Sequence, residues 1–301
     1  MPAQMDYFLD LRNETVGGSV AGSVKLLDGA GRQLPDSSFA VFFSFLQGRE
    51  VLLVTHGFNV DQAGGVHSLG HWATLLDPSL TAVPVGVLWP GDAKHLSALS
   101  YPWEGDEAEH SGQLLARFIN LTFAGAISVS FASHSLGARV VLECISRLDR
   151  GPRRLLLMAG AIDDNCLTNS YKSAAAKVQD ISTLGSKEDN VLKLAFPLGN
   201  PLMGIFDHHH PFWHAALGRN GPTPTPSNIR NPAWQIPHLW DYGHGDYLGK
   251  VDHPDRYALP VELPPPDFPN NFPDNTPLPL KAGKNDFTAA WSAGLGVTRY
   301  R

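Results

Sequence analysis

The stretch Ile127-Ser-Val-Ser-Phe-Ala-Ser-His-Ser-Leu-Gly-Ala-Arg-Val-Val141 decides the fold class of this 301-residue chain. An apolar, β-branched run is followed, after Ser135, by apolar residues at helical spacing, which predicts a strand, a tight turn and a helix. A turn this sharp strains the serine backbone and projects its hydroxyl away from the sheet. Ser135 is therefore the candidate nucleophile, and its backbone dihedrals are expected outside the common regions.

The turn departs at one position from the usual G-x-S-x-G pattern, because Ser133 replaces the first glycine. Serine is small enough for strand and helix to cross there, and the replacement predicts a slightly wider crossing. An ordinary strand-to-helix turn with incidental serines has the same local pattern. Other parts of the chain must distinguish the two.

Composition bounds the class of protein. With 43% hydrophobic and 17% charged residues and no apolar run of membrane length, the chain has the character of a soluble globular protein without a membrane span. A net charge of -6 without a basic cluster argues against a nucleic-acid partner. The N-terminus lacks a basic patch followed by an apolar stretch, so we expect that it is not a secretory signal. A cytoplasmic location is therefore expected. Composition leaves the oligomeric state open.

Four more apolar runs, at residues 51–55, 82–89, 154–162 and 178–184, predict buried strands, and helical patterns stand between them. Strands that alternate with helices predict an α/β fold with a mostly parallel central sheet and helices on both faces. In such a sheet the active site lies at the carboxyl ends of the strands. The turn at Ser135 is predicted to lie at that edge.

Shorter patterns predict the parts that precede this sheet or interrupt it. Alternating runs at residues 7–11, 20–27 and 39–45 predict antiparallel edge strands at the N-terminus. A polar loop is expected at residues 94–106, and a helix at residues 107–121.

The C-terminal third of the chain has little periodicity. Residues 198–240 keep many aromatic side chains, which predicts a cap-like insertion packed over the carboxyl edge of the sheet. The proline-rich residues 254–301 are expected to wrap the molecule in extended form. Residues 1–301 are therefore expected to form a single domain.

A serine nucleophile needs further residues, and the chain offers them in order. The hydroxyl requires a base within hydrogen-bond reach, and the base requires an acid that fixes its tautomer. Hydrolases built on a strand-turn-helix serine have the chain order serine, acid, histidine. Ser135, Asp189 after the fifth strand, and His244 in a glycine-flanked turn fit this order. All three are predicted to meet at one edge of the sheet.

Alternatives exist for the acid and for the base. Asp163 or Asp164, after the preceding strand, is the alternative acid. An aspartate that follows a strand is also often only a helix cap. His238 and His253 are the alternative bases.

The chain resembles the α/β-hydrolases, and within them a bacterial esterase-like branch with many uncharacterised members. The residues that carry the resemblance lie between about 50 and 250: His-Gly-Phe-Asn at 56–59, Trp-Pro at 89–90, Ser-His-Ser-Leu-Gly at 133–137, Ser-Lys-Glu-Asp-Asn-Val-Leu at 186–192 and Tyr-Gly-His at 242–244. The resemblance implies an α/β-hydrolase fold with Ser135 as nucleophile, His244 as general base and Asp189 as its orienting acid.

Acyl transfer also needs donors for the oxyanion that develops in the reaction. The backbone N–H of Leu136 is one candidate, because it follows the nucleophile at a helix N-terminus. The resemblance implies the backbone N–H of Phe58 as the second donor.

A partly covered pocket for acyl chains or aromatic esters is expected above these groups. The candidates for its lining are His56, Tyr101, Trp103, His134, Phe206 and Trp213. Within this set, we expect His134 to pack rather than react. We expect His56 to hold the loop at residues 56–59 that carries the Phe58 N–H, which we call the oxyanion loop.

No metal or organic cofactor is expected. The local cluster at residues 207–210, Asp-His-His-His, has ligand chemistry that suits zinc, but consecutive histidines in a loop cannot easily converge on one ion. Cys144 and Cys166 match no metal or redox spacing, and we expect buried free thiols rather than a disulfide.

The sequence thus predicts a serine hydrolase that cleaves small-molecule carboxylic esters through an acyl-enzyme intermediate. A thioesterase, amidase or acyltransferase would use the same three residues, because pocket walls choose the leaving group and the acceptor. A non-catalytic ligand-binding protein on the same fold is the alternative from a different class.

Overall fold

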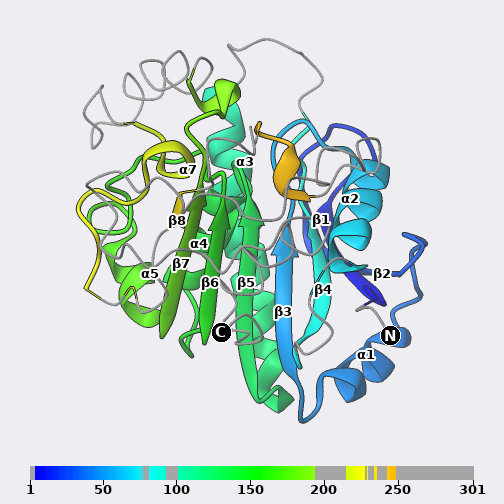
Figure 1. Ribbon diagram of the computed structural model, residues 1–301. Helices are drawn as coiled ribbons and strands as arrows, with labels where there is room; N and C mark the ends of the chain where they lie inside the picture. Colours follow the sequence, from blue (N-terminus) through cyan, green and yellow to red (C-terminus); the bar gives the residue numbers. More distant parts are fainter. Residues whose placement is uncertain are drawn as a thin grey trace, which may run out of the picture.

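The computed structural model describes residues 4–74, 76, 81–92, 101–193, 215–227, 229, 234–235 and 243–248 (Figure 1). For residues 101–105 and 234–235, only the backbone is described.

Eight strands form one sheet in the order β2-β1-β4-β3-β5-β6-β7-β8. Their bounds are β1 Tyr7–Arg12, β2 Val20–Asp28, β3 Glu50–Thr55, β4 Val83–Leu88, β5 Ser128–His134, β6 Arg154–Met158, β7 Asp180–Gly185 and β8 Trp234–Gln235. All neighbouring strands pair in parallel except β1 and β2, which form the antiparallel edge. The predicted fold class, a mostly parallel sheet with helices and antiparallel N-terminal strands, is confirmed.

The helices are α1 Ser38–Leu46, α2 Gln62–Thr74, α3 Tyr101–Thr122, α4 Gly137–Ser146, α5 Lys172–Lys177 and α7 Leu217–Asn220, with short 3-10 turns η2 Phe123–Gly125 and η4 Asp246–Leu248. The chain moves from β3 to β4 in one direction and then back across β3 to β5. Because crossovers are right-handed, this reversal places α2 on one face and α3 with α4 on the other (Figure 1).

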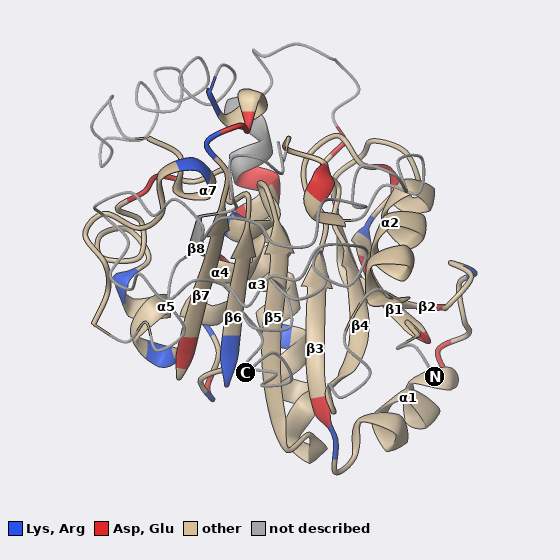
Figure 2. Cartoon of the chain, viewed as in Figure 1, with Lys and Arg blue, Asp and Glu red and all other residues tan. Residues whose placement is uncertain are grey.

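In parallel sheets, ligands bind beside such a reversal, at the carboxyl ends of the strands. β3 and β5 are neighbours, with Thr55 paired to Ser133, so the loops that leave their carboxyl ends lie side by side. Charged residues stand at the amino ends of the central strands, at Glu50, Arg154 and Asp180, while the strand interiors are uncharged (Figure 2). The sheet is therefore a buried, apolar scaffold whose carboxyl edge carries the polar loops.

One predicted element type and one predicted boundary are wrong. Residues 39–45 form helix α1 rather than a strand, because Phe39, Phe42, Phe43 and Leu46 recur at helical spacing and bury Phe42 and Leu46 in the core. The predicted loop at 94–106 ends early, because α3 begins at Tyr101 with a proline in its first turn, where the missing N–H costs no helical hydrogen bond.

The described part of residues 198–240 includes α7 and β8. β8 pairs in parallel with β7, so this piece extends the sheet. The remainder of the predicted insertion and the whole predicted wrap at 254–301 lie outside the described residues, and the single domain stays a prediction.

Cys144 and Cys166 are free and buried, as predicted. Burial raises the pKa of both thiols, so neither is readily deprotonated to the reactive thiolate. Among the described helices, none combines the length and apolar character that crossing a membrane requires.

Candidate active site

Ser135 lies at the junction of β5 and α4 with φ of 53°, in the left-handed region that a side chain rarely adopts. The predicted unusual backbone at this serine is confirmed. Its N–H donates to the Met158 carbonyl at 3.0 Å, and its own carbonyl accepts from the N–H of Ala161 at 3.1 Å. The strained conformation is thus held by the last residue of β6 and by the connection that follows it.

Glycines make the close approach around this turn possible. A Cβ at Gly137 would lie 2.4 Å from the His56 carbonyl oxygen, and a Cβ at Gly57 would lie 2.8 Å from Cβ of Ser135. The loop after β3 therefore runs directly against the turn after β5. Ser133 is fully buried in β5, and the wider crossing expected there stays a prediction.

His244 forms hydrogen bonds with both other residues of the predicted set. Its Nδ1 lies 2.7 Å from Oδ2 of Asp189, and its Nε2 lies 2.7 Å from Oγ of Ser135. A carboxylate can only accept, so Nδ1 carries the proton and Nε2 accepts from the serine hydroxyl. The fold brings together three side chains whose positions in the chain are up to 109 residues apart.

Asp189 is fully buried and uses both carboxylate oxygens. While Oδ2 faces His244, Oδ1 accepts from the backbone N–H of Leu192 at 2.9 Å. Residues 190–193 are helical, so this second bond is an N-terminal helix cap. The cap fixes the rotamer of the carboxylate that faces the imidazole.

The alternative acids lie on another connection. Asp163 and Asp164 follow β6, where Asp163 bridges to Ala216 and the Asp164 N–H donates to the Ala215 carbonyl at 2.8 Å. Their backbones thus join the segment that leads into α7, whereas the carboxylate hydrogen-bonded to His244 is that of Asp189.

The turn that carries His244 is anchored by Asp246, which the sequence did not single out, and by His134, which was expected to pack. Buried Asp246 accepts from the Gly243 N–H at 2.7 Å through Oδ2, which closes the turn. The ring of His134 contacts the turn from the other side, with Nε2 2.6 Å from the His244 carbonyl oxygen.

The predicted oxyanion donors lie at the same place. Within the described residues, neither the Phe58 N–H nor the Leu136 N–H donates a hydrogen bond. Asn59, next to Phe58, has φ of 57° and donates to the Gly91 carbonyl at 2.6 Å. The loop after β3 is therefore fastened to the loop after β4.

His56 is a support for this loop, because it is fully buried. Its Nδ1 lies 2.8 Å from the Gly57 carbonyl oxygen, and its Nε2 accepts from the Trp89 N–H at 3.2 Å. Burial lowers the pKa of His56 to about 4, so the ring is neutral at physiological pH. His56 thus lies beneath the loop rather than in an open pocket.

A buried guanidinium, unforeseen from the sequence, ties the same loops together. All five N–H donors of Arg12, at the end of β1, meet acceptors: the carbonyls of Glu14, Gly17, Val60 and Trp89 and the carboxylate of Asp92. The only sequence signal was a charge at the end of an apolar strand.

Several candidates for the pocket lining cannot be placed in full. Tyr101 and Trp103 belong to the first turn of α3, but their side chains are not described. Phe206, Trp213 and the cluster at 207–210 lie outside the described residues. Among the described residues, no group of three His, Cys, Asp or Glu side chains could hold a metal ion.

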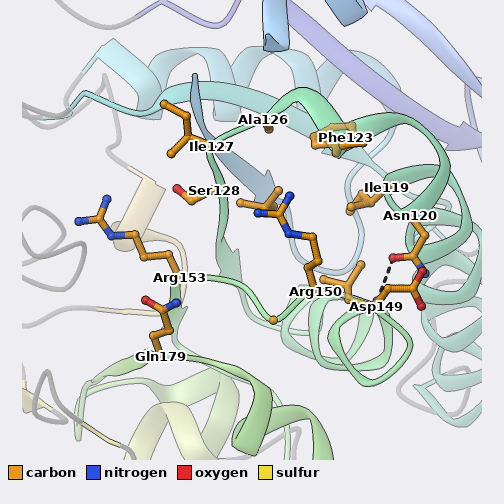
Figure 3. A pocket seen from close by; sticks show the side chains of 14 residues that line it. Ile119, Asn120, Phe123, Ala126, Ile127, Ser128, Asp149, Arg150, Arg153 and Gln179 are labelled. Atoms are coloured by element: carbon orange, nitrogen blue, oxygen red, sulfur yellow. Dashed lines mark hydrogen bonds between the residues drawn. The ribbon is translucent and has the colours of Figure 1, made fainter. Parts of the chain in front are cut away.

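One described cavity, of about 300 Å³, lies at the opposite end of the sheet, at the start of β5 (Figure 3). Phe123, Ile127, Arg150 and Arg153 are among its lining residues. None of the predicted site residues borders it. It is distinct from the edge that carries Ser135.

The sequence matches the family described as alpha/beta hydrolase of unknown function (DUF900) over residues 36–207, more than half of the chain. No curated protein matches the chain.

The solved structures to which this chain is similar include esterases. Esterase PE8 is 14% identical with a TM-score of 0.37, covering 66% of this chain and 86% of that one. An esterase from Pyrobaculum calidifontis is 12% identical with a TM-score of 0.37, covering 67% and 70%. An inhibited esterase B from Lactobacillus rhamnosis is 12% identical with a TM-score of 0.37, covering 69% and 73%.

Proposed function

This chain belongs to the alpha/beta hydrolase family of unknown function DUF900, and on that premise we propose that it is a serine hydrolase that cleaves carboxylic esters of small molecules. The observation that carries the proposal is the hydrogen-bonded series from Asp189 through His244 to Ser135, with 2.7 Å at each step. We further propose that the protein belongs to an esterase-like bacterial branch of the α/β-hydrolases and that it is cytoplasmic.

The mechanism begins with proton transfer. His244 Nε2 accepts the hydroxyl proton as Oγ of Ser135 attacks the acyl carbon, and Asp189 stabilises the imidazolium through Nδ1. The N–H groups of Phe58 and Leu136 donate to the oxyanion of the tetrahedral intermediate. When the intermediate collapses, the ester C–O bond breaks and His244 protonates the leaving alcohol, which leaves an acyl group on Ser135.

Water completes the cycle. His244, neutral again, takes a proton from a water molecule that attacks the acyl carbon of the acyl-enzyme. When the second tetrahedral intermediate collapses, the bond between the acyl carbon and Oγ of Ser135 breaks, the carboxylic acid leaves, and His244 returns the proton to Oγ. The chain's own groups supply every proton transfer and the charge stabilisation, so the proposal invokes no metal or organic cofactor.

The test compares wild type with Ser135→Ala. Wild-type protein is expected to label with a fluorophosphonate probe and to hydrolyse short p-nitrophenyl esters. Ser135→Ala should not label, and its kcat should fall by at least about a thousandfold, because the nucleophile is lost. Arg150→Ala, beside the cavity at the far end of the sheet, is the control and should match wild type.

Absence of wild-type labelling, together with equal hydrolysis by wild type and Ser135→Ala, would overturn the proposal in favour of a non-catalytic binding protein. Matched thioester and amide substrates in the same assay distinguish an esterase from a thioesterase or an amidase. An added alcohol acceptor detects acyl transfer.

A further inference from the structure

His134 lies directly before the proposed nucleophile, yet its ring faces the turn that carries His244. The Nε2 atom is 2.6 Å from the His244 carbonyl oxygen, and the two rings lie 5.0 Å apart between centroids. The ring of the fully buried Tyr247 packs on His134 from the same turn, at 6.2 Å. These contacts join β5 to a segment 110 positions later in the chain.

We infer that His134 is a positioning residue that fixes the backbone of the His244 turn and thereby sets the reach of His244 Nε2 to Oγ of Ser135. The inference rests on the proposed function of Ser135 and His244. It assigns His134 neither a proton-transfer step nor a contact with substrate.

The tautomer of His134 follows from its partner. A carbonyl oxygen can only accept, so Nε2 of His134 must carry the proton. Burial, reinforced by the nearby His244, lowers the pKa of His134 to about 3. The ring therefore stays neutral near pH 7, with its donor aimed at the carbonyl.

The contact complements the other anchors of the turn. Asp189 holds the imidazole of His244 through Nδ1, and Asp246 holds the Gly243 N–H. The hydrogen bond from His134 in addition fixes the main-chain carbonyl of His244 itself. Because Ser135 follows His134 in the chain, a shift of the turn relative to the nucleophile must break this bond.

The space around His134 restricts the side chains that can test this role. A Cβ at Gly57 would lie 2.9 Å from Nδ1 of His134, so the ring is tightly covered by the oxyanion loop. Glutamine and methionine are unbranched and of similar length, but only glutamine ends in an N–H donor. His134→Gln and His134→Met therefore form a matched pair.

The kinetic test measures kcat and KM of wild type and both variants on a short p-nitrophenyl ester. We expect kcat of His134→Met to fall by about tenfold or more, with KM within about twofold, because one buried hydrogen bond and the alignment it sets are lost. His134→Gln should recover most of kcat. Equal kcat values for the two variants would overturn the inference, whether both match wild type or both are impaired.

A second readout is independent of activity. Hydrogen exchange of the amides at residues 243–248 should be faster by about tenfold in His134→Met than in His134→Gln, because local opening of the turn becomes easier. Equal exchange in both variants contradicts the inference even if the protein hydrolyses no ester, whereas failure of the proposed function shows only in the labelling of wild type. His134→Leu is a second donor-free variant in case the methionine variant does not fold.

Discussion

Asp189 shows how one side chain can serve the site and the fold together. Its Oδ2 orients His244, and its Oδ1 caps the helical residues 190–193. From sequence alone, the functional acid and the helix cap are competing interpretations of an aspartate after a strand. The structure has both interactions at once, because the two oxygens of a carboxylate point to different partners.

Asparagine at this position separates the two roles. Asp189→Asn keeps an oxygen for the cap but loses the negative charge that stabilises the imidazolium, so kcat should fall by about a hundredfold to ten-thousandfold. Asp189→Ala also loses the cap and should lower the free energy of unfolding by about 1 kcal/mol more than Asp189→Asn. Ester kinetics and urea denaturation measure the two effects.

The alternative acids supply the control. Asp163→Asn and Asp164→Asn should keep kcat near that of wild type, because the carboxylate bonded to His244 is that of Asp189. A nearly normal Asp189→Asn enzyme would show that the acid has been assigned to the wrong residue.

Sequence reasoning selected the side chains that react in the proposal but not those that hold them. Ser135, Asp189 and His244 follow a known chain order, and the fold brings them into hydrogen-bond contact; their catalytic roles stay predictions. The contacts of His134 and Arg12 join segments distant in the chain, so no local pattern announces them.

At the scale of elements, α4 lies very close to the loop after β3. Eight of the ten residues of α4 are buried, so the helix behind Ser135 has little room to move. Its first residue, Gly137, lies under the His56 carbonyl, where a Cβ would approach to 2.4 Å. A clash between this Cβ and a backbone oxygen cannot be relieved by rotating a side chain.

Gly137→Ala should therefore destabilise the protein, although alanine normally favours a helix. The expected loss is about 1–3 kcal/mol of unfolding free energy, because the helix or the oxyanion loop must shift. Gly70→Ala, in α2 with nothing within 4 Å of the added Cβ, is the matched control and should stabilise by about 0.5–1 kcal/mol. Chemical denaturation compares the two, and equal effects would contradict the close-contact explanation.

Strands and helices could be predicted from the sequence where the spacing of apolar residues matched the faces that the fold buries. The parallel strands have continuous apolar runs because both faces of the sheet are covered, and their positions follow from the sequence. Helix α1 was not predicted, because its phenylalanines also suit a strand. Its helical packing against Tyr7 of β1 depends on tertiary contacts that a local pattern does not contain.

For the whole molecule, the two buried histidines at the site affect stability as well as geometry. The pKa is lowered from 6.5 to about 4 in His56 and to about 3 in His134, chiefly by burial. Between these values and 6.5, the unfolded chain binds protons that the folded chain does not. Stability contributed by the neutral rings is present above pH 6.5 and is lost as the pH falls below it.

The free energy of unfolding should therefore fall by about 2 kcal/mol per pH unit between pH 6 and pH 5, since each ring contributes up to about 1.4 kcal/mol per unit. Urea denaturation across this range measures the slope. In His134→Gln, one titrating group is removed and the slope should drop to about half. A flat dependence in wild type would show that the rings are not held neutral.

The turn at residues 243–248 also has a consequence for how the protein is made. His244 follows Ser135 by 109 positions, and β1 to β7 all precede it in the chain. The ribosome therefore synthesises the strands β1 to β7 and the proposed nucleophile, Ser135, before it synthesises the proposed base, His244. Under the proposed function, the nascent chain can cleave esters only after the turn at residues 243–248 has docked onto His134 and Asp189.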